Sequence, residues 1–176
     1  IFAGARMADI NGYAFVDIIG NSTLNNMLIA RAVYGGNDIS GHILNNGNIK
    51  PFTSSVTSGL PTGLASFVRA QSSATNAFVA NLFGGGNGDY TYTTAQDDKF
   101  NVAVGSETFE VENKPELNNT HIKLLGGIFG NIYGGGNNAT VTKNTVIYMN
   151  NLLANLSVSE ATLGDFKNLF DATDYS

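Results

Sequence analysis

Asp97 and Asp98, followed by Lys99, are the residues of this 176-residue sequence best suited to acid/base or metal-assisted chemistry. Two adjacent carboxylates can bind a divalent cation, and a basic residue such as Lys99 or Arg69 could remove a proton from a polysaccharide. That chemistry needs carboxylates from several neighbouring strands, and the sequence offers one pair in one polar segment. We therefore interpret Asp97 and Asp98 as the solvated tip of a hairpin, and predict no catalytic residue.

A second candidate is the segment 85–89, Gly-Gly-Asn-Gly-Asp, which is close to the calcium-binding pattern Gly-Gly-x-Gly-x-Asp. Its Asp89 comes one residue early, and calcium needs oxygen ligands that converge from successive turns. We interpret the segment as a structural turn, so no cofactor or metal site is predicted, with calcium as the lesser alternative. His42 and His121 share no local motif, and we assign structural roles to both.

The composition argues against several classes of protein. The net charge is −5 with only nine lysines and arginines, which disfavours nucleic acid as a partner. Cysteine is absent, so disulfides and zinc–thiolate sites are excluded. No apolar run approaches the ~20 residues of a membrane-spanning helix, and we predict that the chain is not transmembrane.

One short pattern recurs along the chain: an apolar residue, an aromatic residue, two or three glycines and an asparagine. Intact copies occupy 33–37, 82–87 and 132–137, and a degraded copy occupies 1–6. The pattern predicts a strand that runs into a tight turn, because glycine adopts positive φ without steric cost. The predicted turn residues are Gly4, Gly35, Gly36, Asn37, Gly84, Gly85, Gly86, Asn87, Gly134, Gly135, Gly136 and Asn137.

The aromatic residues of the four copies recur at two near-equal intervals and one shorter interval, which indicates stacked repeats with irregular insertions. Stacked in register, they would form a column of Phe2, Tyr34, Phe83 and Tyr133. We interpret the column as a packed stack, with a platform for sugar rings as the alternative if it faces outward. The asparagines would form an amide ladder. Strand alternation predicts that the pairs Ile29/Val33, Phe78/Leu82 and Ile128/Ile132 face the core.

We therefore predict an all-β fold, a parallel β-helix or solenoid segment with irregular loop insertions and one C-terminal helix. A right-handed coil is expected, although no residue fixes the hand. Residues 1–156 would form the repeats, with an insertion at about 45–75, and residues 157–176 a capping helix and tail. The helix is predicted by the capping box Ser157–Glu160 and by Leu163, Phe166 and Phe170 on one face.

Residues 1–19 align without a gap on residues 132–150. The first copy lacks the strand that precedes the turn in the other copies, so position 1 falls in the middle of a repeat. We therefore expect the chain to be a fragment of a longer one.

The segments 33–41, 82–90 and 132–141 resemble Gly/Asn-rich repeats in large surface or secreted proteins of Bacteroidetes-type bacteria, a mostly uncharacterised, adhesin-like group. The resemblance covers roughly residues 1–43 and 78–150. It implies β-helical repeats and a location outside the cell or on its outer surface. It supplies no catalytic residues.

The function expected from the sequence is that of a structural or adhesive segment of a bacterial surface protein, without catalysis. Its partners would be a glycan, a host or bacterial surface protein, or further repeats of the same chain. One alternative is a β-helix that binds or degrades polysaccharides, which would need Asp, Lys and Arg in one groove. The other is an accessory subunit of an outer-membrane or surface assembly.

Overall fold

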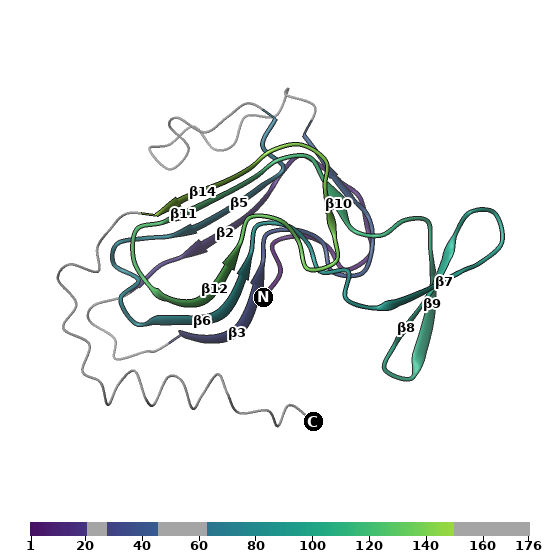
Figure 1. Ribbon diagram of the computed structural model, residues 1–176, viewed down its shortest axis with the longest axis horizontal. Coiled ribbons are helices and arrows are strands. Elements are labelled where there is room, and N and C mark those ends of the chain that lie inside the picture. The colour runs from purple at the N-terminus through teal and green to yellow at the C-terminus, as the bar shows by residue number, and fades with distance from the viewer. Residues whose placement is uncertain (21–27, 46–62, 150–176) are drawn as a thin grey trace.

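The computed structural model describes residues 1–20, 28–45 and 63–149, and this part of the chain is all-β (Figure 1). It contains fourteen strands and no helix, and three of its four sheets are parallel. No helix in these ranges is long and apolar enough to cross a membrane. The predicted C-terminal helix lies outside the described residues.

Two of the parallel sheets take one strand from each of four successive stretches of the chain, and the other takes one strand from each of the last three of these stretches. The first sheet contains β3 (Leu28–Tyr34), β6 (Ala77–Phe83) and β12 (Ile128–Tyr133). The second contains β1 (Ile10–Asn11), β4 (His42–Leu44), β10 (Glu116–Leu117) and β13 (Thr140–Val141). The third contains β2 (Ala14–Ile18), β5 (Ser66–Ala70), β11 (Thr120–Leu124) and β14 (Thr145–Met149). We call the contributing stretches the first to fourth passes: residues 1–18, 28–70, 77–124 and 128–149.

The three sheets hold the passes in one order and in fixed register. In the first sheet, Phe2, Tyr34, Phe83 and Tyr133 are successive partners. In the second, they are Ile10, Ile43, Leu117 and Val141. In the third, they are Ala14, Ser66, Thr120 and Thr145. Each pass therefore lies on the one before it along the second and third sheets, and the first pass joins the first sheet through the single bridge at Phe2.

The main core lies between the first and third sheets. Val33 and Leu82 from the first sheet meet Val68 and Ile122 from the third, and all four side chains are fully buried. A smaller cluster around Ile43, Ala65 and Leu117 fills the space beside the second sheet.

The inward positions of the first sheet differ from those that strict alternation predicts. Val33, Leu82 and Ile132 belong to the core as expected, but the other inward set is Ala30, Val79 and Phe129, and Ile29 is 50% exposed. The ladder is interrupted once between the two sets, at Ala80 in β6 and Gly130 in β12. This interruption shifts by one residue the alternation of inward-facing and outward-facing side chains along each strand.

The insertion predicted at about 45–75 is wrong over its last part. Residues 66–70 form β5, an inner strand of the third sheet. A true excursion occurs in the third pass, where β7 (Thr91–Thr94), β8 (Phe100–Val104) and β9 (Glu107–Val111) form an antiparallel sheet. This sheet projects to one side of the parallel sheets (Figure 1).

The recurring glycines are needed for close approach of backbones and not for positive φ. Positive φ occurs at other glycines, such as Gly12 and Gly41, and at none of the predicted turn glycines. A Cβ on Gly36 would lie 2.7 Å from the backbone nitrogen of Gly86, and one on Gly85 would lie 2.7 Å from that of Gly136. The corners of successive passes therefore leave no room for a side chain between them.

This contact predicts a difference between two glycines of the same pattern. Gly85→Ala should lower the free energy of unfolding by about 1–3 kcal/mol, because the added methyl group must displace backbone. Gly135→Ala, at the equivalent place in the fourth pass, has no described atom within 4 Å of the added Cβ and should leave stability nearly unchanged. Urea unfolding in dilute solution measures both, and equal losses would contradict the account.

Candidate functional site

The four aromatic residues of the repeats form a continuous column of rings. The centroids of Phe2 and Tyr34 lie 4.7 Å apart, those of Tyr34 and Phe83 4.9 Å, and those of Phe83 and Tyr133 4.7 Å. The ring planes are tilted by no more than 11°. The column predicted from the repeats is thus present, and its rings pack face to face.

The column lies on the outer side of the first sheet, because each aromatic residue follows an inward-facing residue such as Val33 or Leu82. Sugar rings stack on aromatic faces, and the two middle rings have both faces covered by their neighbours. Each end ring, Phe2 at 39% exposure and Tyr133 at 45%, keeps one face clear of the column. The stacking therefore argues against the alternative of a sugar platform along the column.

A groove of about 810 Å³ runs beside the column and has a mixed lining. Amides, a carboxylate, a phenol and a guanidinium surround the aromatic edges, from Asn81, Asn87, Asn137, Asp89, Tyr90 and Arg31. Such a lining offers hydrogen-bond donors and acceptors to a polar ligand.

Several of these polar groups bind one another along the stack. The Nδ2 of Asn137 donates to Oδ1 of Asn87 at 3.0 Å, and the Nδ2 of Asn87 donates to Oδ1 of Asp38 at 2.9 Å. The hydroxyl of Tyr90 also donates to Asp38, at 2.7 Å. Burial, with the Asp38 charge adding to it, raises the pKa of Tyr90. Both ends of the Asn87 amide are therefore engaged in the segment that resembles a calcium loop.

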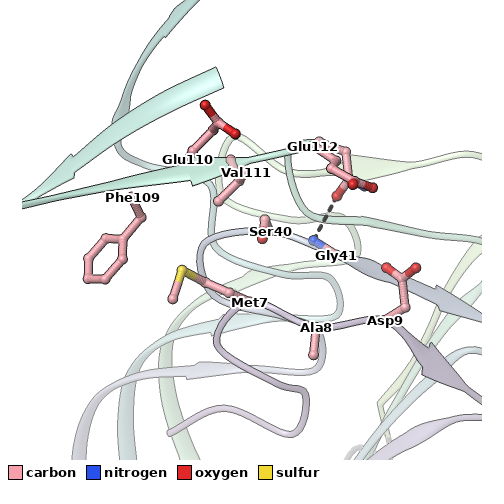
Figure 2. A pocket seen from close by; sticks show the side chains of 10 residues that line it. Met7, Ala8, Asp9, Ser40, Gly41, Phe109, Glu110, Val111 and Glu112 are labelled. Carbon is pink, nitrogen blue, oxygen red and sulfur yellow. Dashed lines mark hydrogen bonds between the residues drawn. The ribbon is translucent and has the colours of Figure 1, made fainter. Parts of the chain in front are cut away.

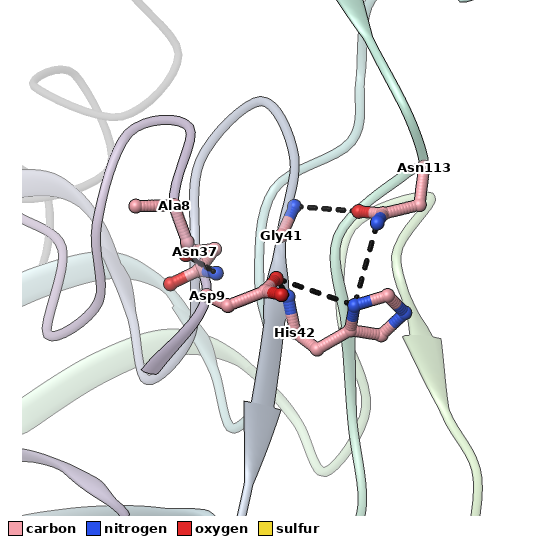
Figure 3. Close-up of polar contacts among 6 residues, drawn as sticks. All are labelled: Ala8, Asp9, Asn37, Gly41, His42 and Asn113. Carbon is pink, nitrogen blue, oxygen red and sulfur yellow. Dashed lines mark hydrogen bonds and ion pairs between the residues drawn. The ribbon is translucent and has the colours of Figure 1, made fainter. Parts of the chain in front are cut away.

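Asn37 has a different role from the other two asparagines. Asn37 is 1% exposed, and its Oδ1 accepts from the backbone N–H of Ala5 at 2.8 Å. Its Nδ2 donates to the carbonyl of Ala8 at 2.9 Å (Figure 3). It thus satisfies the backbone of the first pass across the corner. The amide ladder predicted from the sequence joins Asn87 and Asn137, whereas Asn37 bonds backbone.

Buried hydroxyl groups, which the sequence analysis did not single out, also join the passes. Ser66 donates to the carbonyl of Gly84 and Thr120 donates to that of Gly134, both at 2.6 Å. The two residues are partners in the third sheet and are at most 1% exposed. These residues can be recognised in the sequence only after the strand register is known, because a serine or a threonine then recurs at the same register position of the third sheet.

A second cleft, of about 440 Å³, lies between the first two passes and β9 (Figure 2). Asp9, Glu110 and Glu112 give it an acidic rim, and Met7 and Phe109 supply apolar surface. None of the described residues that line it is basic.

Next to this cleft, His42 contacts both Asp9 and Asn113 (Figure 3). Its Nδ1 is 3.3 Å from Oδ1 of Asp9 and 3.3 Å from Nδ2 of Asn113. The first contact needs a proton on Nδ1 and the second needs a lone pair, so only one is a hydrogen bond in either tautomer. The backbone N–H of His42 donates to Asp9 at 2.7 Å and lowers the pKa of that carboxyl.

This arrangement serves to hold segments together. Asn113 accepts from the backbone N–H of Gly41 at 2.7 Å, so it ties the end of the antiparallel excursion to the second pass. Asp9 ties the first pass to the second through His42. The structural role assigned to His42 from the sequence fits these contacts.

The candidate catalytic residues are not brought together. Asp97 and Asp98 form the exposed turn between β7 and β8, with φ of 57° and 58°. Lys99 pairs with Glu110 at 2.9 Å on the same antiparallel sheet. Arg69 lies on the third sheet and forms an ion pair with Asp17. Within the described ranges, no three His, Cys, Asp or Glu side chains are placed to hold a metal ion.

His121 lies on the outer side of the third sheet with its ring edge-on to Phe67, at 5.6 Å between centroids. Its Nδ1 is buried and has no hydrogen-bond partner among the described residues. Burial lowers the pKa of His121 below its usual 6.5, and the charge of Lys123 lowers it further.

Comparison of the chain with protein-family models, with curated proteins and with solved structures finds no match. The function has to be inferred from the geometry of the chain itself.

The lowered pKa of His121 predicts an acid-sensitive contribution to stability. The unfolded chain binds a proton near pH 6.5 that the folded chain resists, so stability should fall as the pH drops through this value. His121→Phe, which can pack beside Phe67, should remove this part of the pH dependence. Unfolding by urea at about pH 7.5 and about pH 5 measures it, and an unchanged difference in the variant would show that other groups carry the effect.

Proposed function

We propose that the four passes are turns of a parallel β-helix and that the chain is a structural, adhesive segment of a bacterial surface protein outside the cell. The observation that carries this proposal is the shared register of all four passes in three sheets. A stack of this kind lengthens by one strand spacing, about 4.8 Å, per turn without needing a larger core. It therefore makes a stiff spacer with a repetitive outer face.

The use of the polar side chains supports a structural role. Asn87, Asn137 and Asp38 bond one another, and the buried hydroxyls of Ser66 and Thr120 bond backbone carbonyls. These groups stabilise the stack and are not aimed at a substrate. The separation of Asp97 and Asp98 from Arg69 supports the proposal that the chain is not an enzyme.

Two readouts test this function together. Antibodies against the chain should label unpermeabilised cells of the source organism, and the purified chain should turn over no member of a polysaccharide panel. The variant Asp97→Asn/Asp98→Asn should match the wild type in both stability and turnover, because both carboxylates are exposed. Turnover that disappears in this variant would establish the enzyme alternative, and labelling only after permeabilisation would contradict the surface location.

Binding of a glycan is the second candidate function, and the groove beside the aromatic column favours it. Its Asp89 is exposed and offers a charged acceptor of the kind that sugar hydroxyls use, whereas the Asn87 amide already bonds Asp38 and Asn137. This function uses the edges of the rings and the polar rim, and does not need an open ring face.

The groove predicts a specific loss of binding. On a glycan array, Asp89→Ala should weaken any binding by about tenfold, which corresponds to one charge-assisted hydrogen bond. Asp98→Asn is the matched control, since it removes an exposed carboxylate from the excursion at a φ of 58° that asparagine tolerates, and it should leave binding unchanged. Binding that survives Asp89→Ala unchanged would place the glycan elsewhere, and absence of binding would leave the spacer as the function.

A further inference from the structure

The fourth pass ends the described stack, yet its outer edge is built like an inner layer. We call this edge, formed by β12, β13 and β14, the terminal edge. At the inner corners, Gly36 and Gly85 are glycine because the next pass lies directly on them. Gly135 holds the same position in the fourth pass, and a Cβ there would meet no described atom within 4 Å. Its lack of a side chain makes sense if another backbone layer packs on it.

Two further side chains on the terminal edge lack the neighbour that their counterparts have. Tyr34 and Phe83 each stack between two rings, whereas Phe83 is the single ring among the described residues on which Tyr133 stacks, and Tyr133 is 45% exposed. Thr145 is exposed, although its register partners Ser66 and Thr120 each donate to a carbonyl of the following pass.

Apolar side chains are also exposed along β14. Val146 and Ile147 are each 42% exposed, Tyr148 is 50% exposed and Met149 59%. Their register partners in the inner strands β5 and β11 include Val68 and Ile122, which are fully buried. An edge with free backbone groups and apolar side chains is a template for pairing with another strand.

The opposite edge of the stack, made by the first pass, matches the terminal edge in spacing. Phe2, Ile10 and Ala14 hold the register positions of Tyr133, Val141 and Thr145, and the intervals between them are the same in both passes. In the second and third passes, insertions separate the equivalent positions. The first and fourth passes can therefore lie on each other along the second and third sheets, and at the aromatic position of the first sheet.

We propose that the terminal edge binds the first pass of a second copy of this chain, so that copies stack head to tail. The proposal rests on the proposed β-helix and names its partner. Phe2 of the second copy would then continue the ring column on Tyr133, and its β2 would pair with β14. Residues 150–176 contain no copy of the aromatic–glycine–glycine–asparagine pattern. A contact between unlike edges joins copies head to tail, and because each copy would lie on the next along the stacking direction, it gives linear oligomers and not a ring.

The test uses the full chain in sedimentation velocity and electron microscopy over about a hundredfold range of concentration. The wild type should form linear oligomers that grow with concentration. Gly135→Ala should remain monomeric with an unchanged circular dichroism spectrum, because the methyl group is tolerated in one chain and blocks the next layer. Thr108→Ala, on an exposed position of β9, is the control and should assemble like the wild type.

A charge substitution gives an independent check. Asp17, Arg69, Lys123 and Tyr148 form one row across the third sheet, and Asp17 of the second copy would lie on Tyr148. Tyr148→Arg should strengthen assembly and Tyr148→Glu should weaken it. Stability of the monomer should follow the opposite order, because Lys123 is the neighbour within one chain.

A wild type that stays monomeric, or oligomers that persist in Gly135→Ala, would overturn the proposal. Hydrogen exchange separates this failure from failure of the β-helix itself. Monomers with protected amides in β5, β6 and β11 would keep the stacked passes and reject head-to-tail assembly. Absence of protection in these inner strands would reject both.

Discussion

The stack depends on the close approach of backbones at its corners. Gly35 donates to the carbonyl of Phe83 at 2.9 Å, and Gly84 donates to that of Tyr133 at 2.8 Å. These bonds run from each pass to the next at points where a side chain would separate the layers. Once the corners are in contact, the strands that run directly into them have to lie in register, because the chain between corner and strand then has a fixed short length. The aromatic column and the buried hydroxyls follow from this register.

The same constraint explains why the repeated polar residues form few reactive arrangements. Equivalent residues of adjacent passes lie one strand spacing apart, and at that distance an amide bonds the amide above it and a ring stacks on the ring above it. Asn137 on Asn87 and Tyr133 on Phe83 are examples. Side chains that contact the equivalent residue of the adjacent pass in this way stabilise the fold. The surface that remains open to a ligand lies at the edges of these columns and in the insertions.

Much of this arrangement could be predicted from the sequence, because the corners recur as a recognisable pattern. The corner positions, the ring column and the hairpin with Asp97 and Asp98 at its tip are all present. The strand β5 could not be identified, since it carries no corner and follows a segment rich in Pro, Ser and Thr. The reason for the glycines was also wrong, because φ is a local property, whereas the contact of Gly36 with Gly86 joins residues from different passes.

The spacing between corners is unequal along the chain. This explains why some strands could not be predicted from the sequence and why the first and fourth passes differ from the inner ones. The second and third passes place long segments between positions that stay in register, so the sheets tolerate insertions wherever the chain can leave and return at the same layer. The first and fourth passes have no such insertions between their register positions. In a stack where every inner layer is satisfied by its neighbours, unsatisfied backbone and ring faces are concentrated at the two ends. Association of this chain should therefore be governed by its end layers, while its side faces and excursion remain available for a ligand.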